Sequence, residues 1–429
     1  MASKKKLSLA QVTAIGIGGM IGGGIFAVLG LAIAVAGHAV AFTLAAGGVI
    51  ALLTGLSYAH LGLAFRDDGG SFTYIEKAFA APAIAGVAGW LLVAGYIGTL
   101  ALYASAFGAY GATLAGGQSA FVIGAFSALV LIAFLGVNLA GAKQSGGVEF
   151  GIVAVKLSIL ALFAVVGMAS VSASHFEPLF DKGFAAPLAA VALIFVAYEG
   201  FELIPNAVDE MEDPKRNLRR AIVIAILVTT AIYVVVALVA LGNLTPEQIK
   251  HDEEYVLAVA ARPSLGQAGF VLISVAALLS TASAINATLF GAARLAMVMA
   301  REHVLPRIFS MRERNRPVPW VALVALTGLA LAFTLAAPLA VISVFASATF
   351  LLIFAAVNFA ALRLCGRIKL HPLLPLAGGV LSGASFVMLL WHTWETDKAS
   401  LLWLCTFYGL AVLIELFLVW RRGPRGLQT

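Results

Sequence analysis

Two acidic side chains, Glu199 and Glu202, stand inside an otherwise apolar stretch of the chain, which also contains Gly200 and Pro205. A carboxylate is costly far from water, so each acid is expected to face a cavity, to carry a proton, or to lie near the end of the stretch. Proline has no N–H and clashes with the turn before it, which predicts an interruption of a helix here. The alternative is a helix that simply ends early.

A basic residue, Lys156, lies deep in a second apolar stretch, Gly151 to Phe163. Burial favours the neutral amine, so a lysine without a partner at this depth can take up and release a proton. We interpret Lys156 as a proton carrier whose ammonium can replace a bound sodium ion, since it is too far from either end of the stretch to snorkel to water. Glu149, near the start of the same stretch, is interpreted as an ordinary acid of a helix start, and a place in a proton path is the less favoured alternative.

The third unusual feature is the run Gly22-Gly23-Gly24 in the first apolar stretch. Each glycine costs about 0.8–1.0 kcal/mol relative to alanine inside a helix, so three in succession predict an unwound segment. Unwound backbone is tolerated at membrane depth only where protein buries it or a cavity wets it. The alternative is close helix packing through Gly18 and Gly22, which have the G-x-x-x-G spacing.

The composition indicates which elements must position these groups. Of the 429 residues, 62% are hydrophobic and 11% are charged, and the mean hydropathy is +1.01. A soluble core stops growing near ~250–300 residues, so the composition excludes a single aqueous globule as well as disorder, collagen and a coiled coil. The bilayer remains as the solvent. Cys365 and Cys405 support neither a disulfide framework nor a metal site, and we expect no cofactor.

Twelve apolar stretches are long enough for transmembrane helices, which need about 20 mostly apolar residues. They cover residues 9–36, 40–65, 82–113, 119–138, 147–170, 186–206, 219–243, 267–300, 319–336, 338–362, 373–393 and 400–420. The sequence lacks the short alternating strands that are typical of an outer-membrane barrel. It therefore predicts an all-α membrane protein with 12 transmembrane helices.

The basic residues indicate how these helices are oriented. Cytoplasmic loops are enriched in Lys and Arg, and 22 of the 27 Lys and Arg residues fall on one side if the N-terminus is cytoplasmic. We therefore expect a multi-pass protein of the cell membrane (plasma or inner membrane) with both termini in the cytoplasm. The formal charge of +6 is then a topology signal, and no nucleic acid partner is expected.

The two irregular helices, 9–36 and 186–206, are five spans apart and cross the membrane in opposite directions. Interrupted helices at corresponding positions of two inverted halves are typical of secondary transporters. Helix ends present N–H groups to an anion, and unwound carbonyls accept hydrogen bonds from an ammonium, which suits an α-amino acid. The predicted units are a first repeat at 1–171, an extracellular loop at 172–185, a second repeat at 186–363 and two further helices at 373–420.

Several motifs resemble those of the amino acid–polyamine–organocation superfamily, in order along nearly the whole chain. Gly22-Gly23-Gly24-Ile25-Phe26 is similar to its first-helix signature, although many members have serine or alanine where Gly23 stands. Further similar segments are Phe195–Glu202 with Asp209–Ile222, Ser283–Arg294 with Met299–Pro306, and Gly69–Tyr74. The lysine at position 156 resembles that of the proton-coupled, ApcT-like amino acid permeases.

The resemblance implies a LeuT-like 5+5 inverted repeat in which helices 1 and 6 unwind at mid-membrane around the substrate. Lys156, beside helices 1 and 8, would couple transport to protons. Glu202 has the position of an acid found in some amino acid–amine exchangers, so Glu199 and Glu202 are candidates for sensing pH or cationic substrates. The implied binding residues are Ile21, Gly22, Gly23 and Gly24 for the substrate carboxylate, and Phe195, Val196 and Tyr198 for its ammonium. Ile25 and Gly200 are further candidates for substrate binding.

We expect a permease that imports L-amino acids, broad or neutral in type, by proton symport and alternating access. An antiporter of amino acids or their amines, cationic ones included, is the alternative. A non-transporting subunit or sensor fits less well, because scaffolding does not need two polar, glycine-rich segments inside the membrane. An enzyme is not expected, because the sequence has no H-E-x-x-H motif, no P-loop and no Ser/His/Asp set at one depth.

Overall fold

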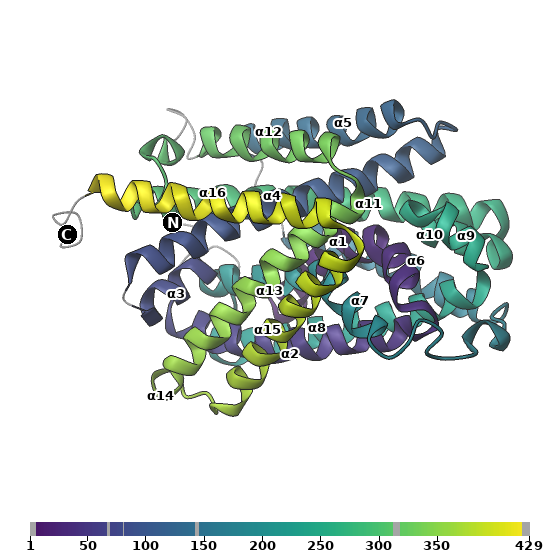
Figure 1. Ribbon diagram of the computed structural model, residues 1–429, viewed down its shortest axis with the longest axis horizontal. Coiled ribbons are helices and arrows are strands. Elements are labelled where there is room, and N and C mark those ends of the chain that lie inside the picture. The colour runs from purple at the N-terminus through teal and green to yellow at the C-terminus, as the bar shows by residue number, and fades with distance from the viewer. Residues whose placement is uncertain (1–5, 67–68, 80, 142–145, 312–317, 423–429) are drawn as a thin grey trace.

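The computed structural model describes residues 6–66, 69–79, 81–141, 146–311 and 318–422, and its regular secondary structure there is helical apart from one isolated β-bridge (Figure 1). The α-helices are α1 Leu9–Ala36, α2 Val40–Ala64, α3 Ser71–Phe79, α4 Pro82–Leu114, α5 Ala120–Leu139, α6 Gly146–Met168, α7 Ala186–Ile194, α8 Pro214–Asn243, α9 Pro246–His251, α10 Val256–Ala260, α11 Arg262–Arg301, α12 Trp320–Ala336, α13 Leu339–Arg363, α14 Cys365–Ile368, α15 Leu373–Thr396 and α16 Lys398–Arg422. The 3-10 helices are η1 Gly37–Ala39, η2 Ala173–Phe176, η3 Phe195–Leu203, η4 Pro205–Glu210, η5 Glu253–Tyr255 and η6 Arg307–Ser310.

The helices agree with the predicted spans. In the described part of the chain, nine helical stretches are long and apolar enough to cross a membrane, and α7 with η3 and η4 would be a tenth. The first stretch, Leu9–Ala64, contains both α1 and α2, and α12 is apolar but has only 17 residues. The protein is thus a multi-pass, all-helical membrane protein, while the count of twelve crossings stays a prediction.

α1 lies at the centre of the molecule. Its residues are apolar on every side, and most of them from Val12 to Ile33 are buried. A helix that is hydrophobic all round belongs inside a bundle, because it has no face to present to water. α6, α7, α8, α11 and η3 all pack against it. The elements that could hold a substrate therefore meet around α1.

The remaining helices form two groups around this centre. α2 packs on α7 and on α8, and all three contact α1. α4, α5, α11 and α12 pack on each other, and α13 contacts α4, α7 and α15. α3 and α14 lie near the end at which α16 finishes, and α9 and α10 lie at the opposite end (Figure 1). The predicted inverted repeat relates parts of both groups, and it stays a prediction.

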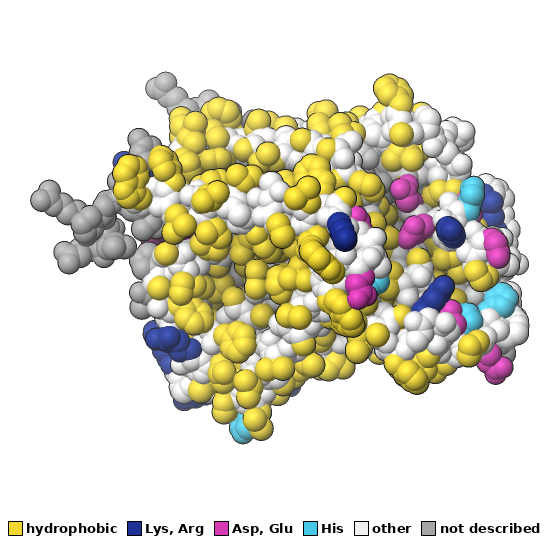
Figure 2. Space-filling model, in the orientation of Figure 1, with side chains coloured by type: hydrophobic (Ala, Val, Ile, Leu, Met, Phe, Trp, Pro, Cys, Tyr) yellow, Lys and Arg dark blue, Asp and Glu magenta, His cyan; other side chains and the backbone are white. Residues whose placement is uncertain are grey.

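The surface agrees with a membrane location. Hydrophobic side chains cover most of the visible face over α12, α13, α15 and α16 (Figure 2). Charged and histidine side chains gather at the right, around α9 and α10, and at the lower left edge (Figure 2). Such a broad apolar surface is too large for a soluble monomer and matches a chain surrounded by lipid.

Candidate functional site

The sixth span is broken in the structure, and the break begins before Gly200 and Pro205, the residues that predict an interruption. α7 ends at Ile194, the chain continues as η3, and the two segments are bent by 41°. Hydroxyl groups of α13 satisfy the backbone at this change: Ser343 and Ser347 donate to the Leu193 carbonyl oxygen at 2.9 and 2.7 Å, and the Val196 N–H donates to Ser347 Oγ at 3.0 Å. Buried irregular backbone needs such partners, so α13 stabilises the break.

The predicted unwinding of the first span is wrong, because α1 is a continuous α-helix through the glycine run. Each glycine of the run meets a different element at a distance that leaves no room for a Cβ atom. The pairs are Gly22 with Ala284 of α11, Gly23 with Tyr103 of α4, and Gly24 with Ala197 of η3. The glycines thus serve close packing, and the intact helix keeps the backbone hydrogen bonds that an unwound segment would lose inside the protein.

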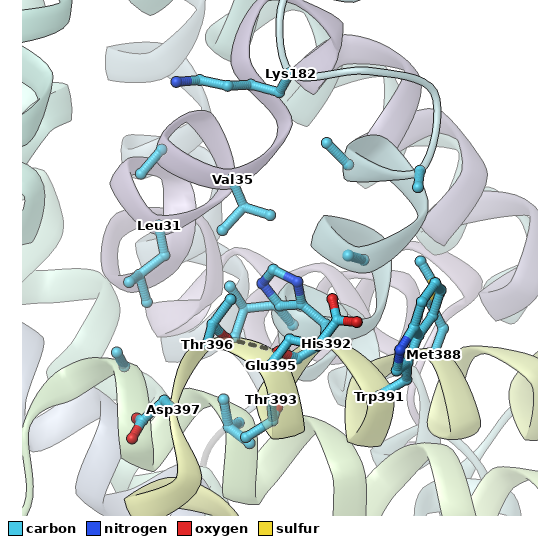
Figure 3. Close-up of a pocket in the computed structure, with 17 residues that line it drawn as sticks. Leu31, Val35, Lys182, Met388, Trp391, His392, Thr393, Glu395, Thr396 and Asp397 are labelled. Carbon is cyan, nitrogen blue, oxygen red and sulfur yellow. Dashed lines mark hydrogen bonds between the residues drawn. The ribbon is translucent and has the colours of Figure 1, made fainter.

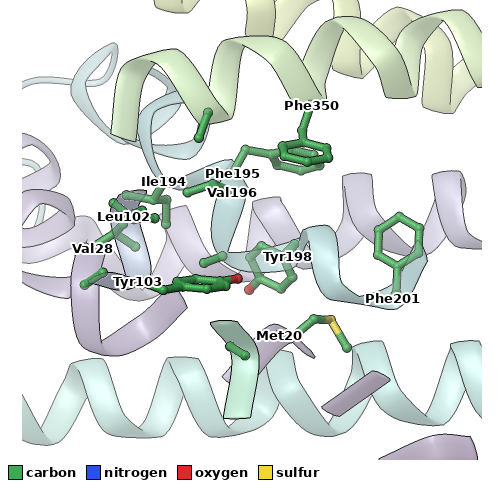
Figure 4. Packing of buried hydrophobic residues seen from close by; sticks show 14 of the residues in the cluster. Met20, Val28, Leu102, Tyr103, Ile194, Phe195, Val196, Tyr198, Phe201 and Phe350 are labelled. Carbon is green, nitrogen blue, oxygen red and sulfur yellow. The ribbon is translucent and has the colours of Figure 1, made fainter. Parts of the chain in front are cut away.

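α1 and η3 touch at the level of the backbone. A Cβ atom on Gly24 would lie 2.7 Å from Cα of Ala197, and one on Gly19 would lie 3.0 Å from Cα of Gly200. Aromatic and aliphatic side chains fill the space around this contact (Figure 4). The structure brings the two predicted binding segments together, and all nine residues are buried: Ile21, Gly22, Gly23, Gly24, Ile25, Phe195, Val196, Tyr198 and Gly200.

Lys156 of α6 reaches α1 just before the glycine run. Its side chain is fully buried, and Nζ donates a hydrogen bond to the Gly18 carbonyl oxygen at 3.1 Å. That carbonyl belongs to a regular helix, so the ammonium adds a second hydrogen bond to an oxygen that has two lone pairs. Since α6 packs against both α1 and α11, the structure places Lys156 in the predicted neighbourhood.

Glu199 and Glu202 are buried and accept hydrogen bonds from hydroxyl groups. Glu199 accepts from Thr99 and Tyr103 of α4, at 2.9 and 3.3 Å. Glu202 accepts from Tyr96 of α4 at 2.6 Å, from Tyr58 of α2 at 3.2 Å and from Ser71 of α3 at 3.4 Å. The acids therefore face the protein interior and tie η3 to α4.

Sequence reasoning missed Tyr233 of α8. Its hydroxyl lies 2.5 Å from the Met20 carbonyl oxygen of α1 and 3.0 Å from that of Ala197 in η3, so one donor spans both elements. Tyr198 makes a similar link from η3 to the Leu44 carbonyl oxygen of α2 at 2.6 Å. Its hydroxyl group inside the apolar span 219–243 could have marked it as a candidate, but the sequence alone does not show which carbonyl oxygens it binds.

A cavity of about 550 Å³ lies beside the C-terminal half of α1 (Figure 3). α1 contributes Leu31 and Val35, and α7 reaches it with Leu193, the residue at which the break begins. The end of α15 lines the other wall with Trp391, His392 and Glu395 (Figure 3). Glu202 borders a second, much smaller pocket together with Ser71 and Tyr96. The two pockets thus flank the closed α1–η3 contact, and neither was predicted.

Known proteins resemble this chain along nearly all of its length. The inner membrane transport protein YbaT of Escherichia coli is 30% identical over 416 residues, which cover 96% of each chain. The serine/threonine exchanger SteT of Bacillus subtilis is 30% identical over 436 aligned residues, which cover 96% of this chain and 95% of that protein.

The fold also occurs in a solved structure. The crystal structure of the Eremococcus coleocola manganese transporter has a TM-score of 0.61 at 13% identity, and the match covers 96% of this chain and 92% of that chain. The sequence model of the family described as amino acid permease matches residues 7–419. In agreement with the superfamily resemblance of its motifs, the protein belongs to the amino acid permease family.

Proposed function

We propose that this protein is a secondary transporter that moves L-amino acids across the cell membrane by alternating access and proton symport. Family membership supports an amino acid as the substrate, as do relatives such as the serine/threonine exchanger SteT and the branched-chain amino acid permease BcaP of Bacillus subtilis. One observation supports the coupling to protons: the buried Lys156 ammonium donates a hydrogen bond to the Gly18 carbonyl oxygen, one turn before the glycine run.

Substrate binding requires α1 and η3 to move apart, because their contact buries every proposed binding residue. η3 is the weaker partner, since a 3-10 helix has poorer hydrogen-bond geometry than an α-helix. Separation of η3 from α1 would expose the backbone of Phe195–Gly200, whose carbonyl oxygens can accept hydrogen bonds from the substrate ammonium.

The proton acts through the strength of one hydrogen bond. A charged ammonium donates a hydrogen bond roughly twice as strong as that of a neutral amine. Protonated Lys156 therefore fixes α1 at Gly18, and the neutral amine releases it. Proton uptake and release would in this way be linked to the movement of α1 relative to α6.

An exchanger of amino acids or their amines is the second candidate. SteT, which is named an exchanger, is similar to this protein over nearly the full length of both. Glu202 would then respond to the charge of the substrate, because it borders the pocket between Ser71 and Tyr96. Exchange needs no net proton movement, which separates the two candidates.

Proteoliposomes with and without a pH gradient test this proposal. Radiolabelled amino acids are first screened at pH 5 and pH 7.5, and uptake of the best substrate is then driven by an inward proton gradient. A one-proton symporter supports up to about tenfold accumulation per pH unit, because each unit is worth 1.36 kcal/mol.

The substitution Lys156→Ala should abolish this accumulation but keep counterflow exchange. Lys398→Ala is the matched control, because Lys398 is exposed at the start of α16 and its ammonium lies over the Trp394 ring. Accumulation that stays normal in Lys156→Ala would show that this lysine does not couple protons to transport.

A further inference from the structure

Glu149, in the first turn of α6, turns its carboxylate towards α1 and α11. Ser283 of α11 donates to it, with Oγ 3.1 Å from Oε1 and 3.0 Å from Oε2. The same carboxylate lies against Gly18 of α1, so closely that a Cβ atom there would overlap Oε1. An acid that only stabilises a helix start needs neither contact, since it acts on the N–H groups of its own helix.

Glu149 and Lys156 meet at the same residue of α1. They are seven residues, or about two helical turns, apart on one face of α6. Long side chains of a helix point back towards its N-terminus, which brings the lysine towards the acid. The Lys156 Nζ binds the Gly18 carbonyl oxygen, and the Glu149 carboxylate fills the space that the missing side chain of Gly18 leaves. The two side chains therefore lie beside the same glycine, and no direct hydrogen bond or ion pair joins them in the described structure.

The other ionisable groups of the elements packed on α6 are directed elsewhere. α1 carries none from Leu9 to Ala36. On α11, the Arg294 guanidinium lies 4.4 Å from the centre of the Phe290 ring, and on α8 the Tyr233 hydroxyl binds α1 and η3. The remaining basic residues lie in the first two turns of α8 or at the ends of α11: Lys215, Arg216, Arg219, Arg220, Arg262 and Arg301.

We propose that Glu149 is the inner proton partner of Lys156 and delivers its proton to the cytoplasm. The proton passes through one bridging water molecule. An N–H bond of the ammonium breaks, the water takes up this proton and releases one of its own, and an O–H bond forms on Glu149, which leaves a neutral amine and a neutral carboxylic acid. The acid then gives the proton to water at the start of α6, where Glu149 is only half-buried. This assignment rests on the proposed symport through Lys156, and it makes Gly18 necessary because any larger residue would displace the acid.

The substitution Glu149→Gln tests the assignment, because glutamine still accepts the hydrogen bond from Ser283 but cannot take up the proton. We expect accumulation driven by one pH unit to fall from about tenfold to none, with counterflow within twofold of the unaltered protein, about 0.4 kcal/mol. Glu149→Asp should restore part of the accumulation and shift its pH profile. Glu302→Gln, which alters an exposed acid next to the end of α11, is the control and should change neither measurement.

The outcomes separate this assignment from the proposed function. If Lys156→Ala fails to accumulate substrate while Glu149→Gln accumulates it normally, the proton partner is wrong and symport through Lys156 stands. If Lys156→Ala itself accumulates substrate, both are wrong. If Glu149→Gln loses counterflow and thermal stability together with accumulation, Glu149 has a structural role and the assignment is overturned.

Discussion

Individual hydroxyl groups hold the elements of the candidate site in place. Tyr233 links α1 to η3, and Tyr198 links η3 to α2, each through a backbone carbonyl oxygen. Of the three accepting residues, only Ala197 lies in a 3-10 helix, whereas Met20 and Leu44 lie in regular α-helices. An unsatisfied buried polar group costs about 1–3 kcal/mol, so Tyr233 stabilises the contact between the two binding segments without a charge.

The substitution Tyr233→Phe removes the hydroxyl between α1 and η3 and keeps the ring. We expect it to lower the free energy of unfolding by about 0.5–1.5 kcal/mol, the usual net contribution of one hydrogen bond. It should also change the apparent affinity for the amino acid, because the contact between α1 and η3 loses the hydrogen bonds of this hydroxyl. Thermal unfolding and uptake kinetics measure the two effects.

Tyr198→Phe is the matched control for Tyr233→Phe, because its hydroxyl also binds a carbonyl oxygen of a bundle helix but not one of α1. We expect a similar loss of stability with a smaller change in affinity. Equal affinity changes in both variants would contradict a special role of Tyr233.

At the scale of elements, the site combines one regular and one irregular helix. η3 departs from α-helical geometry because α13 supplies hydroxyl partners for Leu193 and Val196. α1 stays a regular α-helix, because its glycines allow neighbouring elements to approach closely and its backbone keeps the helical hydrogen bonds. The different geometries of α1 and η3 therefore follow from their neighbours, and the presence of glycine does not decide them.

The substitution Gly24→Ala tests this packing role. Its Cβ atom would lie 2.7 Å from Cα of Ala197, and backbone cannot move aside as a flexible side chain can. Overpacking of this kind costs about 1–3 kcal/mol, more than the roughly 1 kcal/mol gained in helix propensity. We therefore expect a lower melting temperature and weaker transport.

Gly136→Ala in α5 is the control for Gly24→Ala, because a Cβ atom at Gly136 meets nothing within 4 Å. It should leave thermal stability unchanged or raise it slightly. A stabilised Gly24→Ala variant with normal transport would contradict the close contact between α1 and η3.

At the scale of the whole molecule, the helices place the charged segments at two ends and the apolar surface between them (Figure 2). The basic residues predict which end is cytoplasmic. Exposed positions at the two ends, Lys250 of α9 and Arg307 of η6, make this orientation measurable.

We expect a membrane-impermeant thiol reagent to label Lys250→Cys in intact cells and to label Arg307→Cys only after the membrane is opened. Both substitutions are made after the native Cys365 and Cys405 are replaced by serine. Mass shifts of the purified protein report the labelling. The opposite pattern would place the termini outside and reverse the predicted direction of the proton path.

The sequence by itself determined the membrane class, the approximate positions of the long helices and the presence of an irregular segment near Gly200 and Pro205. These follow from local properties: the length of apolar runs, and glycine, proline and acids inside one of them. It also identified Lys156, because a buried charge is rare enough to be noticed without knowing its partner.

Only the tertiary structure decided the state of α1 and the partners of the charged groups. A glycine run has the same sequence whether it unwinds or packs closely, and the neighbours that decide are Ala284, Tyr103 and Ala197, from 80 to 262 residues away in the chain. Likewise, Glu149 looks like an ordinary helix-start acid until α1 and α11 bring Gly18 and Ser283 against it. Contacts between distant segments depend on the packing of the whole bundle, which the local pattern does not contain.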